Sequence, residues 1–155
     1  MRFTTLTLAA SLCAGAAMAA DVAPGDVVFD GSAVPASLTG GAGDPAAGKD
    51  VFTKRSLGNC IACHLISSLD APFPGDVGPS LDGVADRHDE AGLRGILVNS
   101  KMTFEGTVMP AYYKVDGFIR PGNAYTGKAA DDSFGPLLSA QQIEDVIAFL
   151  STLKE

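Results

Sequence analysis

The sequence has little material for an aromatic core and little positive charge. It contains no tryptophan, and aromatic residues make up 7% of the chain. Lysine and arginine together number 11 against 18 aspartate and glutamate residues, which gives a formal net charge of -7. Such acidity argues against nucleic acid as a partner, because nucleic-acid binding depends on neutralising phosphates. It also disfavours adhesion to anionic lipid, and it permits docking to a basic protein partner.

Long apolar runs are scarce as well. The first apolar run begins at Leu6 and ends at Ala17, which is shorter than the roughly 20 residues that a helix needs to cross a bilayer. The run follows Arg2 and closes on small residues up to Ala19, so the sequence predicts a secretory signal peptide over residues 1–19. No later run is long enough to span a bilayer, and we expect no membrane insertion.

Cysteine is nearly absent from the predicted mature chain. Of three cysteines, Cys13 is removed with the signal peptide, and Cys60 and Cys63 remain. The latter two stand in the order Cys-Ile-Ala-Cys-His, which ends at His64. This pattern is the attachment site of a c-type haem, in which the two thiols bind the porphyrin edge and the histidine binds the iron. Cysteines three positions apart lie on one side of a helical turn, so both sulfurs reach the same ring.

Other chemistries use a similar spacing. A thioredoxin-like Cys-x-x-Cys exchanges thiols and follows a strand, and the sequence predicts no such strand. A zinc site needs four ligands; His88 would have to join the motif, and the neighbours Cys63 and His64 would be strained on one small ion. A disulfide leaves His64 unexplained. The motif therefore predicts one covalent haem c, which is attached outside energy-transducing membranes, so we expect a bacterial periplasmic protein.

The remaining chain predicts an all-α fold. Residues 20–43 are rich in glycine, proline and alanine, with only isolated apolar residues, and they predict an irregular, extended N-terminal arm that is not a packed element. A single domain should follow over residues 44–155. Its expected helices cover residues 44–58, 89–99 and the segment after Ser139.

Local signals support these helices. Asp44 precedes a proline at the first helical position, and Ser139 is followed three residues later by Gln142, as in a capping box. Gly48 lies inside the first helix, where glycine costs about 1 kcal/mol relative to alanine. We therefore expect another element to pack closely against Gly48.

The segment after the motif offers further candidates for the haem site. Gly78-Pro79-Ser80-Leu81 predicts a wall beside the histidine, and the Pro79 carbonyl is the candidate acceptor for the second ring N–H of His64. An ordinary turn is the alternative. Arg87 is a candidate for binding a haem propionate, although a solvated surface arginine is the alternative.

A second axial ligand is also expected, because a redox cytochrome needs one. Met109 lies in a loop that Pro110 keeps out of a helix, and a loop can place a thioether over the open face of the ring. Met102, which follows the second helix closely, and His88 are the alternatives. A long segment, residues 111–138, then precedes the last helix, and loops of this length are often functional.

Taken together, these segments resemble class I cytochrome c along residues 44–155. The order is a helix containing Gly48, the haem motif, Gly-Pro-x-Leu, Met-Pro and a final amphipathic helix. In that fold the first and last helices cross near Gly48, with Phe149 at the crossing. A narrower resemblance is to the SoxX proteins, the single-haem subunits of SoxAX cytochromes of bacterial sulfur oxidation. It rests on residues 58–64, 77–81, 109–113 and 140–150.

The resemblance implies a function that composition and spacing do not reach. His64 and Met109 would be the axial ligands. A SoxA-like cytochrome subunit would form a heterodimer with this chain and would couple thiosulfate to a carrier cysteine, the reaction of an L-cysteine S-thiosulfotransferase. The chain would pass the electrons to a small mobile cytochrome. It has no cysteine left to serve as a catalytic ligand, so no catalytic residue is expected on it. The alternative is a free periplasmic electron carrier.

Overall fold

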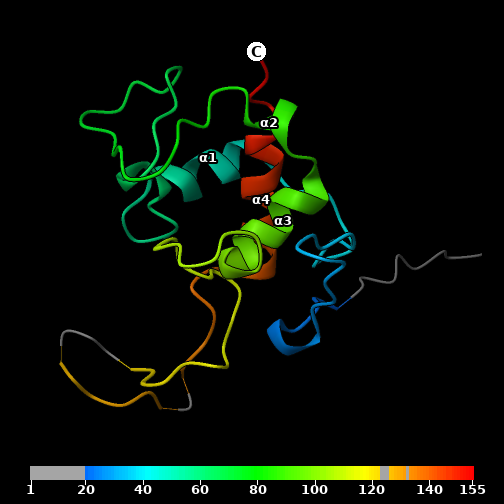
Figure 1. Cartoon of the computed structure of the whole chain (residues 1–155), viewed down its shortest axis with the longest axis vertical. Coiled ribbons are helices and arrows are strands. Elements are labelled where there is room, and N and C mark those ends of the chain that lie inside the picture. The colour runs from blue at the N-terminus through cyan, green and yellow to red at the C-terminus, as the bar shows by residue number, and fades with distance from the viewer. Residues whose placement is uncertain (1–19, 123–125, 132) are drawn as a thin grey trace, which may run out of the picture.

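The computed structural model describes residues 20–122, 126–131 and 133–155 (Figure 1). The predicted signal peptide therefore lies outside the described residues. The helices, in chain order, are η1 (Pro24–Asp26), α1 (Pro45–Thr53), η2 (Cys60–Ala62), α2 (Val84–Arg87), α3 (Glu90–Asn99), η3 (Ser100–Met102) and α4 (Ala140–Leu150). The described part of the chain has isolated bridges but no strand. The prediction of an all-α fold is confirmed.

Helices α1 and α4 cross in close contact. A Cβ atom at Gly48 would lie 1.9 Å from the carbonyl oxygen of Asp145 and 2.9 Å from the Cβ of Phe149. Beside this point the Phe52 and Phe149 rings meet edge to face, with centroids 5.7 Å apart. The expected crossing at Gly48, with Phe149 packed there, is thus present, and it explains why a glycine stands inside α1.

Helix α4 is the most deeply buried element. Ser139 and Gln142 form the predicted capping box. The apolar stripe of Ile143, Val146 and Ile147 is at most 2% exposed. Because α4 is enclosed on several sides, even polar side chains on it are buried, as described below for the arm.

The first helix is shorter than predicted. It ends at Thr53 rather than at Gly58. The N–H of Lys54 still donates to the carbonyl of Asp50, but the N–H of Gly58 returns to the carbonyl of Val51 at 3.0 Å. The chain therefore folds back beneath the helix before it enters the motif, a turn that the helical pattern of apolar residues does not reveal.

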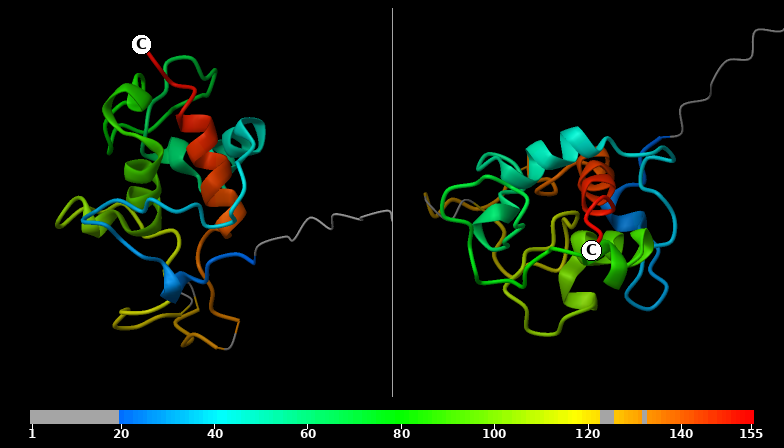
Figure 2. Two further views of the ribbon diagram at one scale, coloured as in Figure 1. Left: turned by 90° about the vertical axis from the view of Figure 1, so that its right-hand side faces the viewer. Right: turned by 90° about the horizontal axis from the view of Figure 1, so that it is seen from above.

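The N-terminal arm is packed through its isolated apolar residues, so the expectation of an extended arm that does not pack is wrong. Val34 and Leu38 are 2% and 1% exposed and belong to the core. The buried Arg94 guanidinium on α3 donates to the Val34 carbonyl at 2.9 Å and to the Glu144 carboxylate at 2.8 and 3.0 Å. Glu144 in turn accepts from the Leu38 N–H at 2.8 Å. Figure 2 shows the arm, blue to cyan, running alongside α3 and α4.

The long segment before α4 is fixed at both ends and exposed between them. Tyr112, Tyr113 and Leu138 are buried, and the Leu138 N–H donates to the Tyr112 carbonyl at 3.1 Å. The described residues between them extend away from the helices (Figure 1), and Ile119 is 98% exposed. In the part of the chain that the structure describes, no helix is both long and apolar enough to cross a membrane.

The helix crossing gives a first prediction. Gly48→Ala should lower the free energy of unfolding by about 1–3 kcal/mol, the usual cost of overpacking, because the new methyl group meets backbone of α4 that cannot rotate away. Urea denaturation followed by far-ultraviolet circular dichroism measures this. Gly25→Ala is the matched control, since a Cβ there meets no atom within 4 Å. Equal stability of the two variants would refute the tight crossing.

Candidate functional site

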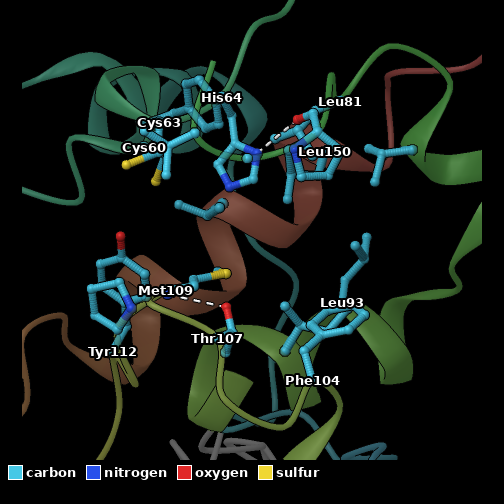
Figure 3. A pocket seen from close by; sticks show the side chains of 18 of the residues that line it. Cys60, Cys63, His64, Leu81, Leu93, Phe104, Thr107, Met109, Tyr112 and Leu150 are labelled. Atoms are coloured by element: carbon cyan, nitrogen blue, oxygen red, sulfur yellow. Dashed lines mark hydrogen bonds between the residues drawn. The ribbon is translucent and has the colours of Figure 1, made fainter. Parts of the chain in front are cut away.

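The Cys-Ile-Ala-Cys-His motif is wound into a short turn. Asn59 enters it with φ 49°, in the left-handed region that asparagine tolerates better than most residues. The His64 N–H donates to the Cys60 carbonyl at 2.9 Å. Cys60 is buried and Cys63 exposed, and both are free thiols. Figure 3 shows their sulfur atoms on the same side of one hollow.

This hollow is a cavity of about 360 Å³ with a mostly apolar lining. It collects the sequence-predicted residues Cys60, Cys63, His64, Pro79, Arg87 and Met109 around one space. His88 also lines it, whereas Met102 lies outside the lining and is 50% exposed. The apolar lining comes from α1, α3, α4 and the wall segment, and it includes Phe52, Leu81, Leu93, Ile96, Val146 and Leu150.

The position and orientation of the His64 ring are fixed by its neighbours. Its Nδ1 lies 2.8 Å from the Pro79 carbonyl oxygen. A carbonyl only accepts, so Nδ1 carries the proton and the lone pair of Nε2 is free to bind a metal. A Cβ atom at Gly78 would lie 2.3 Å from Cε1 of the ring. Glycine at position 78 therefore makes room for the imidazole, and Pro79 sets its orientation.

The wall that carries Pro79 is joined to the motif by backbone hydrogen bonds. These run from the N–H groups of the wall to carbonyls of the motif and of the residues just after it. The pairs are Gly75 to Ile61 at 2.9 Å, Gly78 to Cys63 at 2.8 Å and Leu81 to Leu65 at 2.9 Å. On the histidine side of the cavity, the wall is thus fixed to the motif by backbone hydrogen bonds and is not an isolated turn.

Asp82, which sequence reasoning missed, reinforces this wall. Its carboxylate accepts from the N–H and hydroxyl of Ser67 at 2.8 and 2.6 Å and from the Ser80 hydroxyl at 2.9 Å. The Ser67 hydrogen bonds, followed by that of Ser80, hold the Asp82 pKa below its ordinary 3.8. Arg87 donates to the carbonyls of Asp82 and Ser80 at 2.8 and 3.2 Å. Its guanidinium therefore supports the wall, and propionate binding stays a prediction.

Met109 faces the cavity from the side opposite the histidine. Figure 3 shows the thioether of Met109 and the ring of His64 across the hollow from each other. Between them, at one edge, lies Tyr112, which is 8% exposed and donates from its hydroxyl to the Gly58 carbonyl at 3.2 Å. Met109 as the second axial ligand remains a prediction, and its placement favours it over Met102.

Burial keeps one edge of the cavity uncharged. It raises the pKa of the Cys60 thiol from 9.0 to about 11, and it raises the pKa of Tyr112 above its ordinary value of 10.0. Both groups are already neutral at neutral pH at their ordinary pKa values, and burial keeps them neutral to higher pH. An uncharged edge suits a flat apolar ring, because an isolated charge against such a ring would lack solvation.

The donor set and the lining fit a c-type haem. Two thiols lie at one edge, an imidazole with a free Nε2 lies on one face, and a thioether lies on the other. These are the ligands of a His/Met cytochrome c. Among the described residues, no three histidine, cysteine or acidic side chains gather as they would around a bare metal ion.

Comparison with known proteins agrees with this geometry. The family model described as cytochrome c matches residues 45–154. A chain in the crystal structure of SoxXA from P. pantotrophus is similar, with 58% sequence identity and a TM-score of 0.84. The match covers 88% of this chain and 100% of that one. The comparison with curated proteins gives no match.

The depressed pKa of Asp82 predicts a pH-dependent stability. The pKa of Asp82 lies lower in the folded chain than its ordinary value of 3.8. The ionised carboxylate therefore stabilises the fold at pH values above the pKa of the unfolded chain, and this contribution is lost as the pH falls through the folded pKa. Asp82→Asn should therefore be less stable than the wild type near neutral pH, and the difference should shrink as the pH is lowered through 3.8. Urea unfolding of the holoprotein along a pH series measures this. A difference that stays constant would show that the carboxylate charge is irrelevant.

Proposed function

The chain belongs to the cytochrome c family and is a SoxX-type member of it, and from this premise we propose that it is the electron-transferring, single-haem subunit of a SoxAX-like sulfur-oxidation complex. One observation carries the proposal. The thiols, the imidazole and the thioether converge on one apolar cavity in a chain that is 58% identical to a chain of SoxXA. The covalent haem c makes the chain a redox protein, and the likeness to SoxXA identifies its setting.

The chain's own residues bind and orient the cofactor. Cys60 and Cys63 would hold the ring edge by thioether bonds, and His64 would offer Nε2 while the Pro79 carbonyl keeps the proton on Nδ1. Met109 would supply the second ligand, which raises the reduction potential relative to a second histidine. When bound, haem c supplies one-electron chemistry, and the apolar lining excludes water from it.

The electrons come from sulfur chemistry on the partner subunit. Joining thiosulfate to a carrier-protein thiol forms a sulfur–sulfur bond and releases two electrons and one proton. Haem attachment would use both cysteines of the mature chain in thioether bonds, so no thiolate would remain here to take part in that step. The resemblance to SoxX implies that the catalytic haem lies on a SoxA-like subunit. The two subunits would meet in the periplasm, where this chain would arrive after removal of residues 1–19. This chain accepts the electrons one at a time and passes them to a small mobile cytochrome.

The partner has an apolar rim to cover. Val77 and Val108 line the cavity and yet are 67% and 81% exposed. Exposed apolar residues that gather at one place mark contact surfaces. Val28 on the arm is 77% exposed and Ile119 on the long segment is 98% exposed, and these lie against the same subunit. A stable subunit contact buries more surface than the brief encounter of a mobile carrier.

The division of labour is tested with purified proteins. The chain alone should show no thiosulfate-dependent coupling to a carrier cysteine. Adding the SoxA-like subunit should restore coupling and reduce the haem of this chain, as followed by visible absorption. Turnover by the lone chain would refute the proposal. Co-purification with a terminal oxidase or reductase and no SoxA-like subunit would establish the free carrier instead.

The contact surface is tested in the same preparation. Val108→Lys, Val28→Lys and Ile119→Lys probe the rim, the arm and the long segment in turn. Each should weaken association about tenfold or more, since a charge forced into a buried contact lacks a partner. Val28→Lys and Ile119→Lys, which lie outside the cavity lining, should also keep the haem spectrum. Ala46→Lys on the exposed side of α1 is the matched control and should bind normally. Normal binding by all three variants would show that the interface lies elsewhere on the chain.

A further inference from the structure

The backbone of Met109 is held by side chains from the preceding turn. The Ser100 hydroxyl donates to the Met109 carbonyl at 2.7 Å and is 3.3 Å from the Pro110 carbonyl. The Lys101 ammonium donates to the same Met109 carbonyl. On the other side of the residue, the Met109 N–H donates to the Thr107 hydroxyl at 3.1 Å. Both backbone polar groups of Met109 are thus bound by side chains.

Ser100 is the buried member of this set. It is 0% exposed, and it stands where α3 ends and η3 begins. Its own carbonyl accepts from the N–H groups of Thr103 and Phe104 at 3.2 and 2.9 Å. The Ser100 backbone therefore fixes the start of the loop, and the Ser100 side chain fixes the loop a second time at Met109.

The loop between these points has few other restraints. Residues 103–108 form neither helix nor strand, and Val108 is 81% exposed. Pro110 confines the backbone of Met109 to extended conformations but does not set where the residue lies in space. Beyond Pro110 the chain is fixed again, because the Tyr112 N–H donates to the Leu97 carbonyl at 3.0 Å. The position of Met109 itself depends on the hydrogen bonds to its own peptide groups.

We propose that Ser100, together with Thr107, is a positioning residue for the axial methionine. The Ser100 hydroxyl fixes the carbonyl side of Met109 and the Thr107 hydroxyl fixes its N–H side, so the thioether stays directed into the cavity opposite His64. The inference rests on the proposed function, in which Met109 binds the iron. It assigns the strength of that bond in part to Ser100, which is not in the cavity lining, and in part to Thr107, which lines the cavity beside Met109.

The test measures how easily an added ligand displaces Met109. Imidazole is titrated into the ferric holoprotein, and the visible spectrum reports its binding to iron. A loosened methionine competes less, so Ser100→Ala and Thr107→Val should each bind imidazole more tightly than the wild type, by up to about tenfold, in line with loss of one hydrogen bond. The weak far-red sulfur-to-iron band should fade in parallel. Ser100→Thr, which keeps the hydroxyl, should restore wild-type affinity.

Two controls separate positioning from general destabilisation. The Thr103 hydroxyl lies in the same loop, is buried and has no hydrogen-bond partner among the described residues, so Thr103→Val should leave imidazole affinity unchanged. Val34→Ala weakens the fold where the arm packs on the core, and Val34 is not in the cavity lining, so this variant too should leave the affinity unchanged. An affinity that merely followed the free energy of unfolding across these variants would overturn the proposal.

Met109→Ala distinguishes this inference from the ligand assignment beneath it. Loss of the far-red band in Met109→Ala, with wild-type imidazole affinity in Ser100→Ala and Thr107→Val, overturns the positioning role alone. A band that persists in Met109→Ala overturns the ligand assignment and this inference with it, while leaving the sulfur-oxidation role to its own test. If Ser100→Ala yields no folded holoprotein, Thr107→Val decides the outcome.

Discussion

The close contact between α1 and α4 at Gly48 is the constraint on which the rest of the structure depends. It brings backbone against backbone, with no room for a side chain between the helices. The inner faces of the crossed helices then carry Phe52, Val146 and Leu150 into the lining of the cavity. The haem motif follows the return of the chain beneath α1, so the crossing also sets where the thiols and His64 lie.

The two sides of the cavity are held in different ways. On the histidine side, backbone hydrogen bonds join the wall to the motif, and Asp82 adds a carboxylate bound by serines. On the methionine side, an exposed loop is tied at Met109 by side-chain hydroxyls. A rigid proximal side keeps the histidine in place, and the thioether depends on far fewer bonds. Changes in ligand strength should therefore arise on the methionine side.

The sequence was most informative where the signals are local. The motif and the capping residues of α1 and α4 depend on residues close together in the chain, and the Pro79 acceptor depends on the geometry of a metal-bound histidine. The crossing at Gly48 joins distant residues, and its partner helix was predicted through the resemblance to class I cytochrome c. The packed arm could not be predicted, because the apolar residues Val34 and Leu38 are isolated in sequence. Their burial depends on Arg94 and Glu144, which are distant partners that no periodic pattern connects.

The early end of α1 and the role of Asp82 escaped prediction for related reasons. The chain leaves α1 at Thr53 because the Gly58 N–H finds a carbonyl on the helix it has just left, and this return is a tertiary contact. In the sequence Asp82 does not differ from other surface carboxylates, because its hydrogen bond with Ser67 forms only when the chain folds. Arg87 was predicted from its charge to bind a haem propionate; the structure adds hydrogen bonds to carbonyls of the wall, and propionate binding stays a prediction.

The central claim is that Met109 and His64 bind opposite faces of one haem, and nuclear magnetic resonance of the ferrous protein tests it most directly. Protons held over a porphyrin face are shifted far upfield by the ring current, so a protein labelled at methionine methyl groups should show one methyl resonance outside the usual protein range. That resonance should persist in Met102→Leu and vanish in Met109→Leu. Absence of the shifted methyl resonance, or its loss in Met102→Leu alone, would contradict the account.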